Sequence, residues 1–387
     1  MSGPLAVSLD VSAVPAQPAG AGRYTLDLAD ALARRHGVTL TLVARHGDSG
    51  RWRRLLAGAG AAGRVVPRAP ESRPLRLAWE QARLPGLLGQ LDLDVHHGPH
   101  YTMPERARLP VVVTVHDVTF FDHPEWHERS KVLLFRRAIA VAARRASVVV
   151  CVSQTTADAL ARVVPVSVPV RVATHGVDLG RFSPEEPSPG ADRMELGALG
   201  LDPDRPFVLA VGTLEPRKGL VGLVRAFDRI AGAHRDLVLV LAGQPGWGPD
   251  LLGPAVAAAD HGDRVVRTGY VPDRAVPALL RQAAAVAYPS LEEGYGLPAL
   301  EALACGAPLV TTSGTAMEEL AGPAALLVPP GDEAALAAAL EQLVGGPDPG
   351  RAERRDLGLA RAAQRTWAAS AAQHEAAYAA AVGQGVR

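Results

Sequence analysis

Several features that would assign other protein classes are scarce or absent in this chain of 387 residues. Two cysteines, Cys151 and Cys305, are too few for a disulfide framework and cannot make a zinc site by themselves. No apolar run reaches the ~18 residues that suggest a membrane span, because Arg144 and Arg145 interrupt the longest, Ala138–Val152. The first residues lack the charged and apolar regions of a signal peptide. With a formal net charge of +0 there is also no basic field for nucleic acid, so we expect a cytoplasmic protein that binds none.

Lysine is scarce as well. Of 40 basic residues only Lys131 and Lys218 are lysines, while arginine and alanine are abundant. A lysine ammonium is a compact point charge, whereas the arginine guanidinium is a planar fork, so the two residues are not interchangeable at a binding site. Lys218 is therefore a candidate for a chemical role, and chance retention is the alternative.

The sequence alternates short β-branched runs with helical stretches rich in alanine and leucine. Near-continuous apolar strands alternating with helices indicate parallel sheets covered on both faces. We therefore predict an α/β fold of two doubly wound, Rossmann-like units. The expected strands are Ala6–Asp10, Thr39–Val43, Val111–Val115, Ser147–Val152, Val168–Ala173, Phe207–Val211, Leu237–Ala242, Arg264–Thr268, Ala285–Tyr288, Pro308–Thr311 and Ala325–Val328. The expected helices include Tyr24–Arg35, Ser130–Arg145, Thr155–Arg162, Leu220–Ala233, Arg274–Gln282, Pro298–Ala304 and Glu333–Val344.

A proline-rich, polar segment divides the chain. Ser183–Gly190 has the composition of a linker. The predicted domains are residues 1–183 and 184–365. The last stretch, Leu357–Val382, is predicted to form one or two alanine-rich helices.

The most informative segment is Ser290–Pro308, which places Glu293 and Glu301 on either side of a glycine-rich turn that opens a helix. Gly294 and Gly296 let the backbone turn tightly and approach a ligand. The free N–H groups of the first helical turn favour an anion. The simplest ligand has a phosphate for the N–H groups and sugar hydroxyls for the two carboxylates.

A second segment, Gly212–Gly219, joins an expected strand to an expected helix. Arg217 and Lys218 lie in this loop and suit a diphosphate, one as a bidentate fork and the other as a point charge. The ending of a Walker A loop is absent. An exposed basic start of a helix is the alternative interpretation.

Two features of the N-terminal half are weaker signals. Gly20 and Gly22 precede Tyr24 at the start of an expected helix, but the third glycine of a dinucleotide fingerprint is missing. A helix-entry loop and a ligand contact are about equally compatible with this pattern. His116 and Asp117 follow the strand Val111–Val115, at the edge where α/β sheets bind ligands. A structural His–Asp pair in the core is the alternative there.

The run His96–His100 contains three histidines, yet we predict no metal site. Neighbouring histidines on a strand point to opposite faces, and no Cys or Glu with ligand spacing accompanies them. A loop on the acceptor side is the preferred interpretation.

Together these motifs resemble the retaining glycosyltransferases of family 4. The resemblance covers roughly residues 5–380. It rests on the Glu-x7-Glu spacing of Glu293 and Glu301 with its glycines and proline, on Gly212–Lys218, and on Arg267–Val271 and His175–Asp178. The nearest branch contains O-antigen mannosyltransferases, from the similarity of Gly22–Tyr24, Thr114–Val118 and Gly212–Lys218. Gly219 stands where this family often has asparagine, which could loosen the start of its helix.

The resemblance implies a GT-B architecture with two Rossmann-like domains facing a cleft. The acceptor would bind to residues 1–183, on which the helix at about 366–387 would pack back, and the nucleotide-sugar to residues 184–365. The donor is a co-substrate, and no cofactor or metal is implied. The implied reaction is transfer of a hexosyl group with retention. GDP-mannose is the best guess for the donor, UDP- and dTDP-sugars are alternatives, and an epimerase or a non-catalytic sugar-nucleotide-binding protein are rival functions.

The resemblance also assigns roles to residues. Glu301 would accept hydrogen bonds from the ribose and Glu293 from the sugar, while Arg217 and Lys218 stabilise the leaving diphosphate. His116 would orient hydroxyls of the donor sugar and the acceptor. The remaining donor contacts would be Gly20, Gly22, Gly212, Thr213, Tyr270, Val271, Gly294, Tyr295, Gly296 and Leu297. The acceptor is a hydroxyl of a glycan, a lipid-linked saccharide or a natural product, and contact with a membrane surface is compatible with the sequence.

Overall fold

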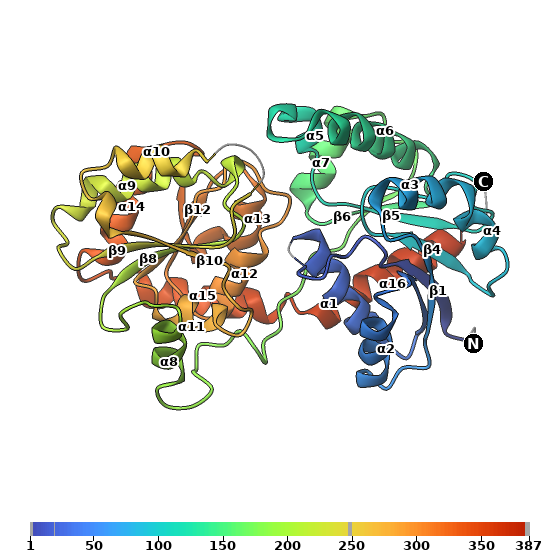
Figure 1. Cartoon of the computed structure of the whole chain (residues 1–387), viewed down its shortest axis with the longest axis horizontal. Coiled ribbons are helices and arrows are strands. Elements are labelled where there is room, and N and C mark those ends of the chain that lie inside the picture. Colours follow the sequence, from blue (N-terminus) through green and yellow to red (C-terminus); the bar gives the residue numbers. More distant parts are fainter. Residues whose placement is uncertain (1–2, 19, 247–249, 384–387) are drawn as a thin grey trace. The chain divides into compact units, whose positions relative to one another are not determined.

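The computed structural model describes residues 3–18, 20–246 and 250–383. The chain divides into two compact units, Met1–Gly176 with Trp367–Arg387, and Val177–Thr366 (Figure 1). The linker composition predicted a boundary after residue 183. In the structure the division falls after Gly176. The proline-rich segment belongs to the second unit because Arg281 fastens it there, donating to the carbonyl of Ser183 at 3.2 Å.

The first unit is built on a seven-stranded sheet in the order β3-β2-β1-β4-β5-β6-β7, in which every pairing is parallel. Its central strands are buried and rich in valine, as expected for a parallel sheet covered on both faces. The strands are β1 (Leu5–Asp10), β2 (Val38–Arg45), β3 (Arg64–Ala69), β4 (Val95–Gly98), β5 (Val111–Val115), β6 (Val148–Cys151) and β7 (Val170–Val172).

The helices of this unit include α16, which is the last element of the chain. Ala371, Ala377 and Tyr378 of α16 are buried in the same hydrophobic core as the first strand and the first helix. The helices are α1 (Ala21–Ala33), α2 (Ser49–Gly58), α3 (Arg73–Ala82), α4 (Leu84–Leu88), α5 (Thr119–Asp122), α6 (Arg129–Arg145), α7 (Gln154–Val163) and α16 (Trp367–Gly383).

The second unit has a six-stranded parallel sheet in the order β10-β9-β8-β11-β12-β13. Leu223, Phe227 and Leu340 pack on this sheet in its main core. The strands are β8 (Phe207–Val211), β9 (Val238–Ala242), β10 (Val265–Gly269), β11 (Ala285–Tyr288), β12 (Leu309–Thr312) and β13 (Leu326–Val328). The helices are α8 (Ala191–Ala198), α9 (Leu220–Ala231), α10 (Leu252–Ala257), α11 (Val276–Gln282), α12 (Leu297–Ala304), α13 (Ala316–Ala321), α14 (Glu333–Val344) and α15 (Arg351–Ala363), with a short 3-10 turn η2 (Pro216–Lys218).

These sheets confirm the predicted fold class, but the sequence pattern missed two strands. β3 contains Pro67 and two arginines and lies at the edge of the sheet, where a missing N–H is tolerated. β4 is only four residues long and consists of Val95, two histidines and a glycine. Its histidines were interpreted as part of a loop, whereas the structure places them inside the sheet.

Candidate active site

The two predicted phosphate-binding segments meet in the second unit. β8 and β11 are neighbours in a parallel sheet, so the loops after them leave the same edge. A backbone hydrogen bond of 2.8 Å from the N–H of Leu291 to the carbonyl of Arg217 joins the two loops. Thr311 and Thr312 fix the second loop from the next strand by donating to the carbonyls of Tyr288 and Ser290, each at 2.8 Å.

Glu293 is the centre of this meeting point. Its Oε2 lies 2.9 Å from Nη1 of Arg217, and its Oε1 accepts a hydrogen bond from Nζ of Lys218. The same Oε1 accepts from the hydroxyls of Tyr288 at 3.1 Å and Ser290 at 3.3 Å. The structure therefore brings together three of the four residues predicted to be catalytic.

The charges of this cluster depend on one another. Burial opposes ionisation of Glu293, but Arg217 and Lys218 outweigh it and lower the pKa of Glu293 to about 2. Burial likewise lowers the pKa of Lys218, and the charge of Glu293 opposes that shift. Nζ of Lys218 also lies 4.6 Å from the centre of the Tyr288 ring, a cation–π distance. The cluster is thus an ionised set held together inside the unit.

Gly219 has a specific structural role at the end of the basic loop. Its φ of +66° is left-handed, and a Cβ at this position would collide with the carbonyl oxygen of Pro289. Helix α9 begins directly after it, at Leu220. Gly219 therefore allows the loop after β8 to pack against the loop after β11, a close approach that a side chain would block.

Helix α12 begins as the sequence predicted. Gly296 precedes it with a φ of +99°, and Pro298 occupies its first turn. A Cβ at Gly296 would overlap the side chain of Met317. Glu301 lies one turn into α12 and is close enough to Tyr288 that its charge, after burial and Glu293, adds to the raised pKa of that hydroxyl. The second glutamate of the motif therefore also belongs to this neighbourhood.

The other predicted donor contacts of this unit lie on the same edge of the sheet. Gly212 and Thr213 follow β8 directly, and Gly212 has a φ of +135°. Tyr270 and Val271 follow β10, two strands away from β8. The side chain of Tyr270 is half exposed, whereas Val271 is buried.

In the first unit, His116 follows β5 and is 7% exposed. Its Nε2 lies 2.8 Å from the carbonyl oxygen of Pro99. A carbonyl only accepts, so Nε2 carries the proton and Nδ1 keeps its lone pair. Burial lowers the pKa of His116, against the opposing effects of the Pro99 bond and Asp117, and so favours this neutral ring. The expected alternative of a hydrogen-bonded His116–Asp117 pair is wrong, because Asp117 accepts from Thr119 at 2.7 Å instead.

Tyr101 holds a strained position beside His116. Among the described residues it is the only one other than glycine with a positive φ, at 65°. Its ring meets the His116 ring edge-on, with centroids 5.5 Å apart and planes at 74°. A bulky residue in this region is costly and is often found at functional sites. Gly20 and Gly22, also predicted as contacts, lie at the start of α1 in the same unit.

A chain of buried hydrogen bonds that was not predicted runs through the first unit. Nδ1 of His374 lies 2.8 Å from the carbonyl of Ser370, so it carries the proton and Nε2 accepts. The hydroxyl of Tyr24 therefore donates to Nε2 of His374 at 2.8 Å. That leaves the Tyr24 oxygen to accept from the hydroxyl of Thr114 at 2.9 Å.

The chain continues through His97. Its Nε2 donates to the oxygen of Thr114 at 2.7 Å, and its Nδ1 accepts from Tyr378 at 2.8 Å. The chain thus begins and ends on α16 and crosses α1, β4 and β5 on the way. His97 is one of the three histidines considered above for metal binding. Both of its ring nitrogens are hydrogen-bonded within this chain. Among the described residues no group of three or more His, Cys, Asp or Glu is placed to hold a metal ion.

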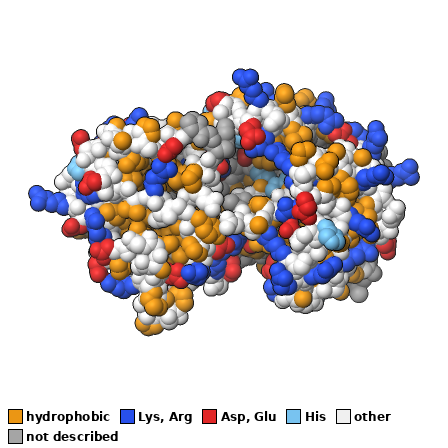
Figure 2. Space-filling view, viewed as in Figure 1, with side chains coloured by type: hydrophobic (Ala, Val, Ile, Leu, Met, Phe, Trp, Pro, Cys, Tyr) orange, Lys and Arg blue, Asp and Glu red, His pale blue; other side chains and the backbone are white. Residues whose placement is uncertain are grey.

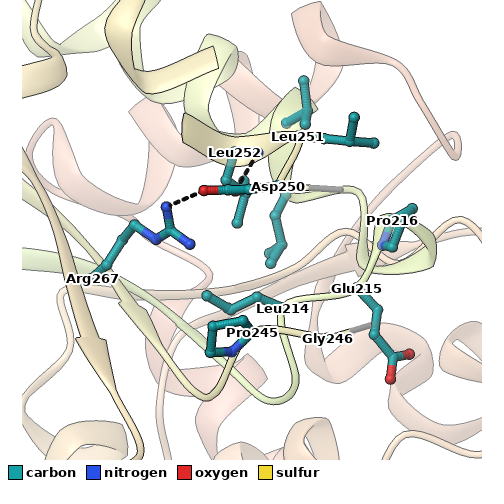
Figure 3. A pocket seen from close by; sticks show the side chains of 11 residues that line it. Leu214, Glu215, Pro216, Pro245, Gly246, Asp250, Leu251, Leu252 and Arg267 are labelled. Atoms are coloured by element: carbon teal, nitrogen blue, oxygen red, sulfur yellow. Dashed lines mark hydrogen bonds and ion pairs between the residues drawn. The ribbon is translucent and has the colours of Figure 1, made fainter. Parts of the chain in front are cut away.

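Sequence reasoning missed three partners of the charged cluster. Tyr288 and Ser290 stand at the end of β11 and just beyond it, and Glu215 lies in the basic loop. Their positions beside the predicted motifs were the available signal. Glu215 also lines a mainly apolar pocket whose wall carries an ion pair of 2.9 Å between Arg267 and Asp250 (Figure 3).

Comparison with known protein families gives two matches that follow the two halves of the chain. Residues 18–181 match the model "Glycosyltransferase Family 4", and residues 194–358 match "Glycosyl transferases group 1". An O-antigen chain mannosyltransferase B of Escherichia coli is 31% identical over 277 residues, covering 70% of this chain and 71% of that protein. The chain belongs to the family 4 glycosyltransferases. This result confirms the family predicted from the motifs.

Other relatives of this glycosyltransferase differ in the activity that their names state. A D-inositol 3-phosphate glycosyltransferase of Actinosynnema mirum is 31% identical over 334 residues and covers 76% of each chain. An alpha-D-kanosaminyltransferase of Streptomyces kanamyceticus is 29% identical over 255 residues and covers 64% of each chain. The family thus includes enzymes for several sugars.

Solved structures confirm the GT-B fold. Sucrose-phosphate synthase from Thermosynechococcus elongatus superposes with a TM-score of 0.75 at 22% identity, covering 97% of this chain and 98% of the other. The Anabaena protein HepE, solved in complex with UDP-glucose, has a TM-score of 0.74 at 21% identity and covers 96% and 98%. At these identities the likeness establishes the fold of this glycosyltransferase.

Proposed function

We propose that this glycosyltransferase moves a hexosyl group from a nucleotide-diphospho-sugar to a hydroxyl acceptor, with retention of configuration and without a metal. The observation that carries the proposal is the convergence of Arg217, Lys218 and Glu293 at the edge shared by β8 and β11. Two cations beside the N-terminus of α12 suit a diphosphate, and two carboxylates in the same neighbourhood suit sugar hydroxyls.

The chemistry asked of this site is stabilisation of a departing diphosphate. Arg217, Lys218 and the N-terminus of α12 supply positive charge at fixed positions, which is the role that a metal ion has in other transferases. Glu293 is assigned to binding of sugar hydroxyls, and we assign no carboxylate as a covalent nucleophile. A front-face reaction, in which a leaving phosphate oxygen takes the proton of the acceptor hydroxyl, fits this arrangement.

GDP-mannose is the proposed donor, on the strength of the similarity to an O-antigen mannosyltransferase. UDP- and dTDP-sugars are the alternatives. The structural likeness to a protein solved with UDP-glucose supports a UDP-sugar as one of them. Tyr270 and Val271, which follow β10, are proposed to frame the nucleobase, and Glu301 to bind the ribose. His116 is proposed to orient a substrate hydroxyl by accepting its hydrogen bond at Nδ1, the ring nitrogen that carries no proton.

A lipid-linked saccharide is the proposed acceptor, and the surface of the first unit supports this choice. Helix α6 carries six basic residues and no acidic one. Leu133, with 73% of its surface exposed, stands one turn from Arg129 and one turn from Arg137. Leu75 of α3 is also 64% exposed. Figure 2 shows basic and hydrophobic side chains mixed over the first unit. Exposed leucines among arginines suit an anionic membrane surface.

The test is a screen of GDP-, UDP- and dTDP-sugars for binding and consumption, with and without acceptor. Transfer of one sugar to a hydroxyl acceptor, with the anomeric configuration of the donor kept in the product, is the expected result. Activity should survive a chelator; abolition by EDTA and rescue by Mg²⁺ or Mn²⁺ would refute the metal-free site. Conversion of the sugar without an acceptor would favour an epimerase, and binding without any consumption would favour a non-catalytic protein.

A further inference from the structure

The cations at the proposed donor site already have carboxylate partners. Arg217 lies between two carboxylates, with Nε 2.9 Å from Glu215 and Nη1 2.9 Å from Glu293. Lys218 pairs with the other oxygen of Glu293. Two cations and two carboxylates therefore pair with one another, and Glu301 is a further carboxylate nearby. The groups that should bind a diphosphate are thus occupied by side chains of the same unit.

Burial makes this balance sensitive to an added charge. The side chains of Glu293 and Lys218 are only 8% and 10% exposed. A buried charge that loses its partner is strongly unfavourable, and so is an excess of one sign in a poorly solvated place. A diphosphate that simply joined these paired charges would add at least two negative charges beside the carboxylates. At least one carboxylate must therefore leave its cation when the donor binds.

The contacts indicate which of the two carboxylates the diphosphate displaces. Glu293 occupies Nη1 of Arg217 and Nζ of Lys218, the two cationic groups of the loop after β8. Glu215 holds Nε of Arg217 from within the basic loop, two residues away. In Figure 3 its carboxylate points away from Asp250 and Leu252 and leaves the apolar pocket free. Glu215 can keep the guanidinium oriented while another anion replaces Glu293.

We propose that Glu293 is a displaceable counter-ion that occupies the place of a donor phosphate, and that Glu215 is the positioning residue that keeps Arg217 in orientation during the exchange. On donor binding, phosphate oxygens take the positions of Oε1 and Oε2 on Lys218 and Arg217. The released carboxylate is then available to the sugar hydroxyls. The inference rests on the proposed function for the identity of the anion. It goes beyond that function by making binding of the diphosphate compete with Glu293.

The exchange has a consequence that a simple binding role for Glu293 does not have. Glu293→Gln keeps the shape of the side chain but removes the competing charge. Binding of inorganic pyrophosphate, GDP and UDP should therefore tighten, by about tenfold for the loss of one close charge partner. Transfer should nevertheless fall, because the sugar loses its carboxylate. If Glu293 only oriented the cations, the variant would bind these anions more weakly.

The experiment is titration calorimetry of the full chain with each of the three anions. Glu333→Gln is the matched control, because Glu333 also pairs with two arginines of the second unit, Arg225 at 2.9 Å and Arg229 at 3.6 Å. Neither arginine pairs with Glu215 or Glu293. It changes the net charge equally and should leave all three affinities unchanged. Glu215→Gln should weaken anion binding, since Arg217 loses its fixed orientation.

The outcomes separate this inference from the proposed function. Tighter pyrophosphate binding by Glu293→Gln with no binding of any nucleotide by either protein would support the exchange and reject the nucleotide-sugar donor. Nucleotide binding and transfer by the original chain, with unchanged or weaker anion binding by a folded Glu293→Gln variant, would leave the function standing and overturn the exchange. Equal tightening by Glu333→Gln would also overturn it, as an effect of net charge alone.

Discussion

At the residue scale, the two lysines of this arginine-rich chain have different surroundings. Lys131 pairs with Glu128 at the surface of the first unit, with 29% of its side chain exposed. Lys218 is 10% exposed and contacts both Glu293 and the Tyr288 ring. A compact ammonium fits this confined position, whereas a guanidinium is larger and planar. The hypothesis that Lys218 has a chemical role therefore gains a physical basis in its burial.

Lys218→Ala should lower the turnover number by about 10²–10³, the usual loss when one preorganised charge-stabilising group is removed. Arg217→Ala should have a loss of the same order. Lys131→Ala, measured with a water-soluble acceptor, is the control and should leave turnover near its original value. Rates from steady-state kinetics decide the matter; a Lys218→Ala enzyme with most of its activity would mean that the diphosphate binds elsewhere.

His116→Ala should depress transfer by about 10², because loss of a positioned group at the reacting centre misaligns the substrates. Binding of the nucleoside diphosphate should be spared, since Arg217, Lys218 and Glu301 belong to the second unit. His96→Ala is the matched control. That ring is also buried in the first unit and contacts Ser8 at 3.1 Å, so it should lower the melting temperature similarly but keep transfer. Near-normal transfer by a well-folded His116→Ala protein would remove His116 from the mechanism.

At the element scale, the site depends on how closely two loops approach. The loop after β8 and the loop after β11 come from neighbouring strands, which fixes their bases. Their contact further out needs Gly219, whose missing Cβ leaves room for the carbonyl of Pro289. The sequence suggested that Gly219 could loosen the start of α9, but the structure gives it a role in close packing. The family's common asparagine tolerates a positive φ, yet here its Cβ would meet the same carbonyl.

Gly219→Ala should destabilise the protein by more than the ~1–2 kcal/mol that a left-handed conformation alone costs a residue with a Cβ. Gly190→Ala separates the two contributions, because Gly190 has a φ of +81° and nothing within 4 Å of its Cβ position. Urea unfolding of both variants measures the difference. Gly219→Ala should also reduce transfer, since it moves the backbone beside Glu293. Equal stability of the two variants would show that the Pro289 contact is unimportant.

At the scale of the whole molecule, a neutral total charge conceals an uneven distribution. The chain has 40 basic and 40 acidic residues, but α6 alone collects six basic and no acidic ones. Glu105 and Glu128 pair with some of them, at 2.5 Å to Arg137 and 2.7 Å to Lys131. No helix in the described part of the chain is long and apolar enough to span a bilayer. The membrane contact proposed with a lipid-linked acceptor is assigned to the exposed leucine and the arginines of α6.

The protein should bind vesicles that contain phosphatidylglycerol more tightly than vesicles of phosphatidylcholine alone, and salt should weaken this binding by screening. Leu133→Ser should reduce it about tenfold, by removing an apolar side chain that the interface would bury. Met194→Ser is the control, since Met194 is 69% exposed on α8 of the other unit. Co-sedimentation with vesicles measures the bound fraction of the original chain and of both variants. No binding at low salt, or equal effects of the two substitutions, would argue for a soluble acceptor.

The sequence by itself determined the fold class and the motifs of the proposed donor site. Both depend on local signals: buried parallel strands are continuous apolar runs, and a tight turn before a helix needs glycine and tolerates proline. The positions of Gly296 and Glu301 at the start of α12 follow from such signals. The family assignment depends on the same short segments, and the matches to family models confirm it.

Only the tertiary structure decided which charges meet. Glu293 and Lys218 are 75 positions apart, and their pairing follows from the adjacency of β8 and β11, which no local pattern encodes. The short β4 and the edge strand β3 were missed for a similar reason, because neighbouring strands stabilise them more than their own composition does. The buried hydrogen-bond chain through His97 spans 350 positions at its longest step, from Tyr24 to His374. Burial and pairing across such distances belong to the folded chain, since they arise only when the sheets bring the segments together.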